Sequence, residues 1–538
     1  MTPSPVQDAS PAIRTAPVQP PRSSRRRWRA AGSAVIGALA VASAGIAGTA
    51  SAGTTEPVGA APAGTLDVGV VGLPPTQGNP YGALGSPSIY TWSALFDALT
   101  LVDANGQAAP ALATEWESVD DVTWRFTLRD GVTFSNGEPF DAAAVVAAWD
   151  YLSSEEGKAS VVGRELVTIS SITAVDPRTV EIATAGPDPV LPNRVSAMFI
   201  VAPQQWADLG PDGFAAEPVG TGPFAVDSWG TTEVSLVANT ESWRQPGVES
   251  VVLTALPEPA SRVQALQSGQ IDIALGVSPD QISAIEESGA SVDVRPASQV
   301  MSLTFISTDP ESPFADQRVR VALNLAVDRQ AIVDGLMAGL GAPASQGATP
   351  AANGYDESLA PIAFDPERAT ELLAEAGYPD GFSFVAEVVV GSFPADAEIY
   401  QAMAENLRQI NVEVELRQLQ FSEWLEKYNN GTWEGEAFGL SWNTAPYLDA
   451  IRPYNYASCL KEPAFFCDDA QLALIEEAGA TLDPEARRAV LAELAVLTVE
   501  NPPSLFLVEQ IDLHGISAEV TGFENVNRFI PYEKITVA

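Results

Sequence analysis

"TWRFTLRDGVTFSNGEPFDAAAVVAAWDYL", Thr123 to Leu152, is the most regular stretch of the chain, and the fold can be read outward from it. At its start Trp124, Phe126 and Leu128 alternate with polar residues, which is typical of a half-buried strand. Two glycine-containing turns and a second short strand follow. From Asp141 onward, apolar residues recur at helical spacing. The stretch therefore predicts paired strands followed by an amphipathic helix.

The acidic residues of this stretch have structural explanations. Asp130 and Glu138 lie in the two turns, and Asp141 stands where the first residue before a helix accepts backbone hydrogen bonds. We therefore interpret the stretch as scaffold and not as a catalytic centre.

Length and charge restrict the class of protein. A chain of 538 residues is too long for one ordinary core, so two or three domains are expected. The formal net charge of −41 would repel phosphate backbones, which excludes nucleic acid as an expected partner.

The first 52 residues have the pattern of an export signal. A basic segment at 25–29 precedes an Ala- and Gly-rich apolar run, and residues 50–52 (Ala-Ser-Ala) offer a small-x-small cleavage site. The segment at 24–28 also resembles a twin-arginine signal, so both general secretory and twin-arginine export fit. Residues 53–63 read as a small-residue linker. The mature protein is expected to be soluble and extracytoplasmic, that is, periplasmic, at the cell surface or secreted.

Cysteine and histidine usage limits the metal and redox chemistry. The two cysteines, Cys459 and Cys467, are expected to form a disulfide in an exported chain, with two buried free thiols as the alternative. Neither cysteine follows the cleavage site, so no lipid anchor is expected. The single histidine, His514, lies in a strand-like run. No metal site and no cofactor are therefore expected.

The pattern of a capped helix between strands recurs further along the chain. Asp365 and Asp483 each precede a proline and a helical run. Between these helices, strand-like segments at 382–390 and 411–419 flank a helix around 402–407. This β–α–β order predicts an α/β domain with a largely parallel sheet.

Six motifs in a fixed order carry a resemblance to a known family. They are "LFDALTLVDANGQAAPALATEWESVDDVTWRFTLRDGVTFSNGEPFDAAAVV" (95–146), "GTGPFAVDSW" (220–229), "RVQALQSGQIDIALG" (262–276), "FADQRVRVALNLAVDRQAIV" (314–333), "FDPERATELLAEAGYPDGF" (364–382) and "EARRAVLAELAVLTVENPPSLFL" (485–507). Together they resemble the family 5 extracellular solute-binding proteins, the oligopeptide, dipeptide and nickel receptors of ATP-binding-cassette (ABC) importers.

The resemblance implies a two-lobed α/β periplasmic-binding-protein fold of class II, cluster C, with a third domain inserted in lobe 1. The two crossovers between lobes would lie at "VMSLTFIST" (300–308) and "PPSLFLVEQ" (502–510). The implied ranges are 64–110, 219–300 and 506–538 for lobe 1, 111–218 for the inserted domain and 301–505 for lobe 2.

No catalytic motif stands beside this resemblance. The chain lacks G-x-S-x-G, H-E-x-x-H and the Gly-Lys-Ser/Thr of a P-loop. Gly220-x-Gly222 and Gly339-x-Gly341 imitate a dinucleotide fingerprint, but neither joins a strand to a helix. The chain is therefore predicted not to be an enzyme. The alternative is a secreted hydrolase that uses paired carboxylates in its cleft.

The resemblance also places candidate ligand-binding residues. Trp424 and Trp442 fall where the family has tryptophans beside ligand side chains, and Tyr90, Thr91 and Trp92 fall on a stretch that resembles its ligand-facing strand end. For each of these residues, core packing is the alternative.

The chain departs from the family where peptide-binding members hold the ligand's ends. After Trp442 it reads Asn443, Thr444 and Ala445, and Ala445 stands where those members have an aspartate for the peptide's amino group. Asn429 stands near the expected partners of the ligand's carboxylate. Unless Asp449 or a nearby acid substitutes, the resemblance implies a ligand neutral or blocked at its ends, such as an oligosaccharide or a modified peptide, held by stacking on tryptophan.

The expected partners follow from the same resemblance. They are a small organic solute, with a peptide as the family's usual ligand, a membrane permease and separate ATPase subunits, and the receptor itself is expected to be a monomer.

Overall fold

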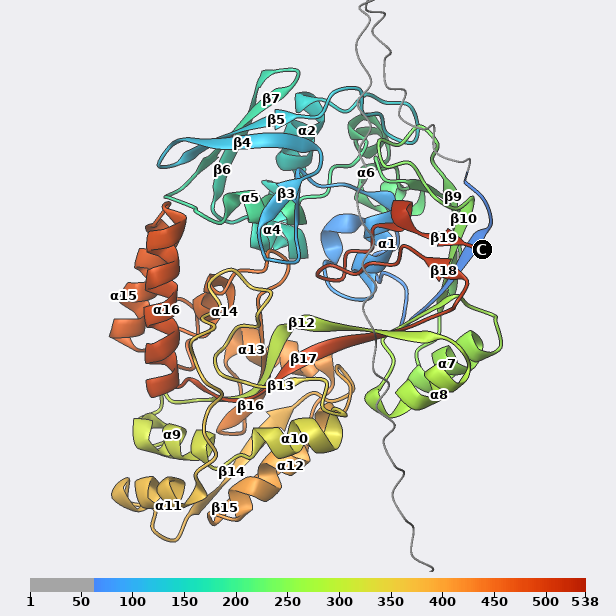
Figure 1. Ribbon diagram of the computed structural model, residues 1–538. Coiled ribbons are helices and arrows are strands. Elements are labelled where there is room, and N and C mark those ends of the chain that lie inside the picture. The colour runs from blue at the N-terminus through green and yellow to red at the C-terminus, as the bar shows by residue number, and fades with distance from the viewer. Residues whose placement is uncertain (1–61) are drawn as a thin grey trace, which may run out of the picture. The chain divides into compact units, whose positions relative to one another are not determined.

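Two long strands, β12 (Ser291–Phe305) and β17 (Ser504–Ile516), run antiparallel through the middle of the molecule (Figure 1). The structure, a computed structural model, describes residues 62–538; the predicted export signal (1–52) and residues 53–61 of the linker lie outside the described residues. The register between the two strands is irregular between Pro296 and Ser302. This irregularity adjoins the crossovers that the sequence predicts, whereas the predicted domain boundaries themselves stay predictions.

A single mixed sheet contains both long strands. Its order is β15-β14-β16-β12-β17-β11-β1-β10-β9-β8, and β13 pairs with β17. Parallel pairing is confined to β14 with β15 and β16, and to β1 with β10 and β11. The prediction of a largely parallel sheet therefore holds for the edge formed by β14, β15 and β16 but not for the sheet as a whole. The other strands are β1 (Thr65–Val70), β8 (Phe224–Trp229), β9 (Glu233–Ala238), β10 (Ser250–Ala255), β11 (Ile273–Leu275), β13 (Ala342–Pro343), β14 (Phe382–Val388), β15 (Val412–Gln418) and β16 (Ala437–Asn443).

A separate four-stranded antiparallel sheet lies within the range predicted for the inserted domain. Its order is β4-β5-β7-β6, and α2 (Ala142–Leu152) packs beside it. Asp141 caps α2 by accepting the backbone N–H groups of Ala143 and Ala144, as predicted. Glu138 accepts the N–H of Gln204 at the start of α6 (Pro203–Ala216). The strands are β4 (Ala113–Asp120), β5 (Thr123–Leu128), β6 (Ile169–Asp176) and β7 (Thr179–Thr184), and the hairpin before them is β2 (Thr100–Val102) with β3 (Ala108–Pro110).

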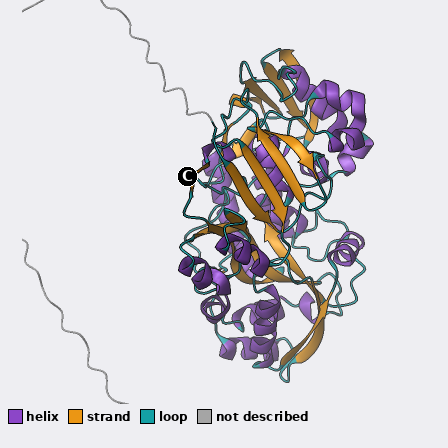
Figure 2. Ribbon diagram, turned by 90° about the vertical axis from the view of Figure 1, so that its right-hand side faces the viewer, coloured by secondary structure: helices purple, strands orange, loops and turns teal. Residues whose placement is uncertain are grey.

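The remaining helices cover the sheets on several sides (Figure 2). Asp365 and Asp483 cap their helices through their side chains, as the sequence predicts. The helices are α1 (Ser88–Leu95), α3 (Glu155–Ala159), α4 (Val161–Glu165), α5 (Leu191–Arg194), α6 (Pro203–Ala216), α7 (Pro259–Gln267), α8 (Ile282–Glu287), α9 (Gln317–Leu325), α10 (Arg329–Leu336), α11 (Pro366–Glu375), α12 (Asp396–Arg408), α13 (Phe421–Asn430), α14 (Ile451–Tyr456), α15 (Asp469–Ala480) and α16 (Pro484–Glu500). Within residues 62–538, no helix combines the length and the apolar character that crossing a membrane requires.

Candidate functional site

A cavity of about 510 Å³, here called cavity 1, opens where several segments of the chain meet. Its walls come chiefly from the region of α1 and the β2–β3 hairpin, from α4 in the range predicted for the inserted domain, and from two later segments, 443–452 and 524–534. These segments lie far apart in the sequence. A ligand in cavity 1 would therefore touch segments from distant parts of the chain at once.

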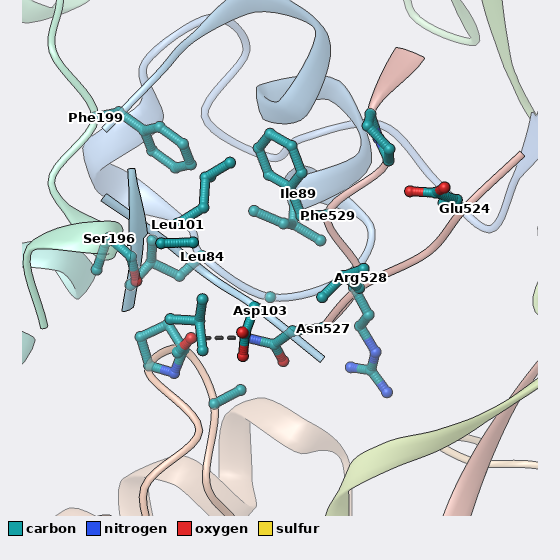
Figure 3. Close-up of a pocket in the computed structure, with 18 of the residues that line it drawn as sticks. Leu84, Ile89, Leu101, Asp103, Ser196, Phe199, Glu524, Asn527, Arg528 and Phe529 are labelled. Atoms are coloured by element: carbon teal, nitrogen blue, oxygen red, sulfur yellow. Dashed lines mark hydrogen bonds between the residues drawn. The ribbon is translucent and has the colours of Figure 1, made fainter. Parts of the chain in front are cut away.

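One side of cavity 1 is apolar. Figure 3 shows Leu84, Ile89, Leu101, Phe199 and Phe529 grouped along it. Ile89 is presented by the first turn of α1 and Leu101 by β2, two elements whose other side chains are largely buried in the core. Such a surface favours an apolar or aromatic body in the ligand.

The lining of cavity 1 also contains charged residues, and most of their charges are paired within the protein. Arg452 bonds to Glu165 of α4 at 2.7 Å, and Arg528 bonds to Asp512 of β17 at 2.9 Å. Burial alone would raise the pKa of Asp512, but the Arg528 guanidinium outweighs burial and holds that pKa below its usual range.

The loop that contains Arg528 also joins two parts of the cavity wall. Asn527 and Arg528 both have positive φ, at 50° and 66°, which is uncommon for residues other than glycine. The side-chain amide of Asn527 donates a hydrogen bond of 2.7 Å to the carbonyl oxygen of Pro446, drawn as a dashed line in Figure 3. The strained turn thus holds the two later segments together across the cavity.

A second, smaller cavity of about 270 Å³, here called cavity 2, lies beside β16. Its lining includes Met301, Phe393, Phe421 and Trp424, so it is rich in apolar and aromatic groups. Asn443, at the end of β16, lines both cavities. The two cavities therefore adjoin at this residue.

Comparison with known proteins identifies the family. The model of the bacterial extracellular solute-binding proteins, family 5 (middle), matches residues 107–461, more than half of the chain. The chain belongs to this family. As a family 5 protein it is a solute-binding protein of the kind that serves ABC importers, and neither an enzyme nor the hydrolase that the sequence left as an alternative.

Its curated relatives include glutathione-binding proteins. GsiB of Salmonella typhimurium LT2 is 27% identical over 465 residues, which cover 83% of this chain and 89% of the relative. GsiB of Salmonella paratyphi A is 32% identical over 312 residues, which cover 57% of this chain and 60% of the relative.

Solved structures share the two-lobed fold. The periplasmic binding protein DppA of Helicobacter pylori, in complex with peptide STSA, has a TM-score of 0.75 at 22% identity and covers 88% of this chain and 98% of its own. AgaA of A. tumefaciens R10, in complex with agropinic acid, has a TM-score of 0.74 at 24% identity, with coverages of 88% and 99%. The predicted fold class is thereby confirmed.

Trp442 of this family 5 protein lies in the core and not in the cleft, which corrects its expected role in ligand binding. Its ring is 0% exposed and packs edge-on against Tyr454 and Phe506. Its indole N–H donates to Ser504 Oγ at 3.0 Å, and Gly347 leaves no room for a β-carbon against the ring. A ring enclosed on all sides offers no face on which a ligand can stack.

The three candidates from the range predicted for lobe 1 are also buried in the protein. Tyr90, Thr91 and Trp92 lie within α1, not at a strand end, and all three are buried. The indole N–H of Trp92 donates to the carbonyl oxygen of Ala83 at 2.8 Å. The expected ligand contacts are therefore corrected to core packing, while the neighbouring Ile89 faces cavity 1.

The candidates in the 424–449 segment divide between cavity and scaffold. Trp424 and Asn443 line cavity 2, and Asn443 and Ala445 line cavity 1. Thr444 is buried and donates both its N–H and its hydroxyl to the carbonyl oxygen of Ser298. Asn429 is exposed near the end of α13 and lines neither cavity, so its role in ligand binding stays a prediction.

Asp449 does not substitute for the acid that Ala445 lacks. It is 0% exposed, and its two oxygens accept hydrogen bonds of 2.7 and 2.8 Å from the guanidinium of Arg487. A buried carboxylate that already forms a bidentate ion pair with an arginine is not free to bind a ligand.

The structure contains the predicted disulfide. The structure joins Cys459 to Cys467 with an Sγ–Sγ distance of 1.96 Å.

His514 is fully buried in β17, where Nδ1 accepts the N–H of Gly276 and Nε2 lies 2.6 Å from the side-chain amide of Asn525. Burial lowers the pKa of His514 to about 4. Among residues 62–538, no group of three or more metal-binding side chains comes together.

For several cavity residues, nothing in the sequence indicates that they line a common site. Glu165 and Arg452 are 287 positions apart, and Asn527 lies in a loop near the chain's end. Their proximity is set by the tertiary fold, and neither spacing nor periodicity of a single sequence reports it. The one usable signal was local, since Arg452 follows closely after the 442–445 segment that the resemblance had singled out.

Proposed function

We propose that this family 5 protein captures a small organic solute in cavity 1 and delivers it to the permease of an ABC importer. The observation that carries the proposal is that the wall of cavity 1 is closed by contacts between distant segments. Glu165 bonds to Arg452 on one side, and Asn527 bonds to the Pro446 carbonyl on another. A site built this way couples ligand binding to the approach of the parts that surround it.

The size of the cavity points to a small ligand. A volume of about 510 Å³ lies within the range of roughly 300–1,000 Å³ that is common for small-molecule sites. Relatives named for glutathione and a neighbour solved with a short peptide support a ligand of short-peptide size. Because Trp442 is enclosed, aromatic contacts to the ligand would come from Phe199 and Phe529, and from Trp424 if the ligand reaches cavity 2.

We further propose that the chain works outside the cytoplasm, exported by the segment at 1–52, and that it acts as a monomer with separate permease and ATPase subunits. The structural likeness to the periplasmic protein DppA and the basic-apolar-small order of residues 25–52 support the proposed export.

Native mass spectrometry of protein purified without refolding tests the proposed function. We expect a co-purified solute that dissociates on unfolding and, when added back, raises the unfolding temperature without being consumed. Excess ligand at a hundredfold over Kd should add about 2.7 kcal/mol to the free energy of unfolding. Steady conversion of the solute into product would contradict the receptor role.

A further inference from the structure

The charges around cavity 1 are unequal. The lining itself has four carboxylates and four cations, and the ion-pair partners behind it add two more carboxylates, Asp97 and Asp512, which makes six against four. The carboxylates belong to Asp97, Asp103, Glu165, Asp512, Glu524 and Glu533, and the cations belong to Arg244, Arg452, Arg528 and Lys534. Five of the carboxylates have a cationic partner at 3.0 Å or less. Among the described residues, Asp103 has none.

Asp103 is held in place by one oxygen and leaves the other free. It follows β2 directly, and its Oδ1 accepts the backbone N–H groups of Asn105 and Gln107 at 2.8 and 2.9 Å, which fixes the β2–β3 turn. Within residues 62–538, Oδ2 has no hydrogen-bond partner in the structure. Figure 3 shows Asp103 beside Asn527, and both residues line cavity 1.

A half-buried carboxylate without a partner favours a cation at short range. A carboxylate attracts a cationic group within about 4–6 Å, and its free oxygen can accept a hydrogen bond from an ammonium group. Leu101 stands two residues before Asp103, so the two side chains lie on the same face of the hairpin and both line the cavity. An ammonium at Asp103 would therefore place an attached apolar body against Leu101 and Ile89.

We propose that Asp103 binds a primary ammonium group of the solute, and that the solute is a net cation with an apolar body. This inference rests on the proposed function, because it concerns the occupant of the same cavity. It replaces the neutral, stacked ligand that the sequence suggested, since the stacking surface of Trp442 is buried and Asp103 is the lining carboxylate that has no cationic partner among the described residues.

Four probes that share one body test the charge preference. They are leucyl-leucine amide (a cation), leucyl-leucine (a zwitterion), N-acetyl-leucyl-leucine amide (neutral) and N-acetyl-leucyl-leucine (an anion). Calorimetric titration at pH 7 and low salt should show the cation binding at least about tenfold more tightly than the neutral probe, and the anion binding most weakly. Raising the salt concentration should weaken the preference.

The variant Asp103→Asn keeps an oxygen for the turn and removes the charge, so the tenfold preference should fall to about one. Asp120→Asn is the matched control, because Asp120 holds the β4–β5 hairpin through Val122 in the same way and lines neither cavity. Equal affinities for the four probes, or a preference that survives Asp103→Asn, would overturn the inference. Failure of all four probes to bind would overturn it too, while a solute retained in native mass spectrometry would leave the proposed function standing.

Discussion

At the level of single residues, internal pairing decides which charged groups remain for a ligand. Asp449 lies in the segment that forms the cavity wall, yet it belongs to the scaffold, because Arg487 of α16 takes both of its oxygens. Asp103 lies in an ordinary turn, and its carboxylate remains available to a ligand because it has no cationic partner among the described residues. The sequence alone could not tell that Asp449 is paired and Asp103 is not, because Arg487, the partner of Asp449, lies 38 residues away.

The variant Asp449→Ala should unfold far more easily than the wild type. It leaves the Arg487 guanidinium buried without its counter-charge, which typically costs about 3–5 kcal/mol. Urea unfolding followed by circular dichroism measures the loss. The control is Glu371→Ala, which breaks an exposed pair with Arg368 and should cost less than about 1 kcal/mol. Equal losses in the two variants would show that the buried pair is not the stabilising element described here.

Two buried groups of β17 should give opposite dependences of stability on pH. The pKa of His514 is lowered by burial to about 4, so between pH 4 and 6.5 the unfolded chain holds a proton that the folded chain lacks, and stability rises with pH. Burial raises the pKa of Glu509 to about 7, so between pH 4.5 and 7 the folded chain holds the extra proton, and stability falls with pH. Each effect amounts to roughly 3 kcal/mol over its full range.

Single substitutions separate these two effects. From pH 5 to 7 the free energy of unfolding of His514→Asn should fall more steeply than that of the wild type, because the Glu509 contribution remains alone. That of Glu509→Gln should instead rise. Urea unfolding at pH 5, 6 and 7 gives both slopes. Parallel pH profiles for the wild type and both variants would mean that neither group is shifted as described.

At the level of elements, the nine-residue loop "CLKEPAFFC" is held both by its disulfide and by its packing. Phe465 and Phe466 are buried, and Phe465 packs edge-on against Phe438 of β16. Thiol titration of the unfolded, unreduced protein should find no free thiol. Because the loop is short, the double variant Cys459→Ser/Cys467→Ser should lose only about 2 kcal/mol of unfolding free energy. Two titratable thiols in the wild type would contradict the bond.

The elements that the sequence predicted well are those whose determinants are local. Asp141, Asp365 and Asp483 begin their helices because a cap and the turn it binds lie within three residues of each other. Strand β16 shows the limit of such reasoning. Its residues 437–440 are all buried, so periodicity does not say which face meets the cleft. Trp442 falls on the core side and Asn443 on the cavity side, a difference of one position that only the register with β12 decides.

At the level of the whole molecule, one sheet connects the two halves through β12 and β17, and the cleft contacts are made by loops and helix ends. The family and its two-lobed fold could be predicted from ordered motifs. The cavity could not, because it depends on contacts such as those between Asn527 and Pro446 and between Glu165 and Arg452, which join segments from different parts of the chain.

The most direct test of solute binding in cavity 1 is calorimetric titration of the co-purified solute into the wild type, Ala445→Phe and Ala284→Phe. Ala445 lines cavity 1, so an added phenyl ring should occupy the ligand's space and reduce affinity at least a hundredfold, about 2.7 kcal/mol. Ala284 is exposed on α8, outside both cavities, and its variant should bind like the wild type. Thermal unfolding without ligand confirms that both variants fold. Wild-type affinity in a folded Ala445→Phe variant would contradict binding in cavity 1.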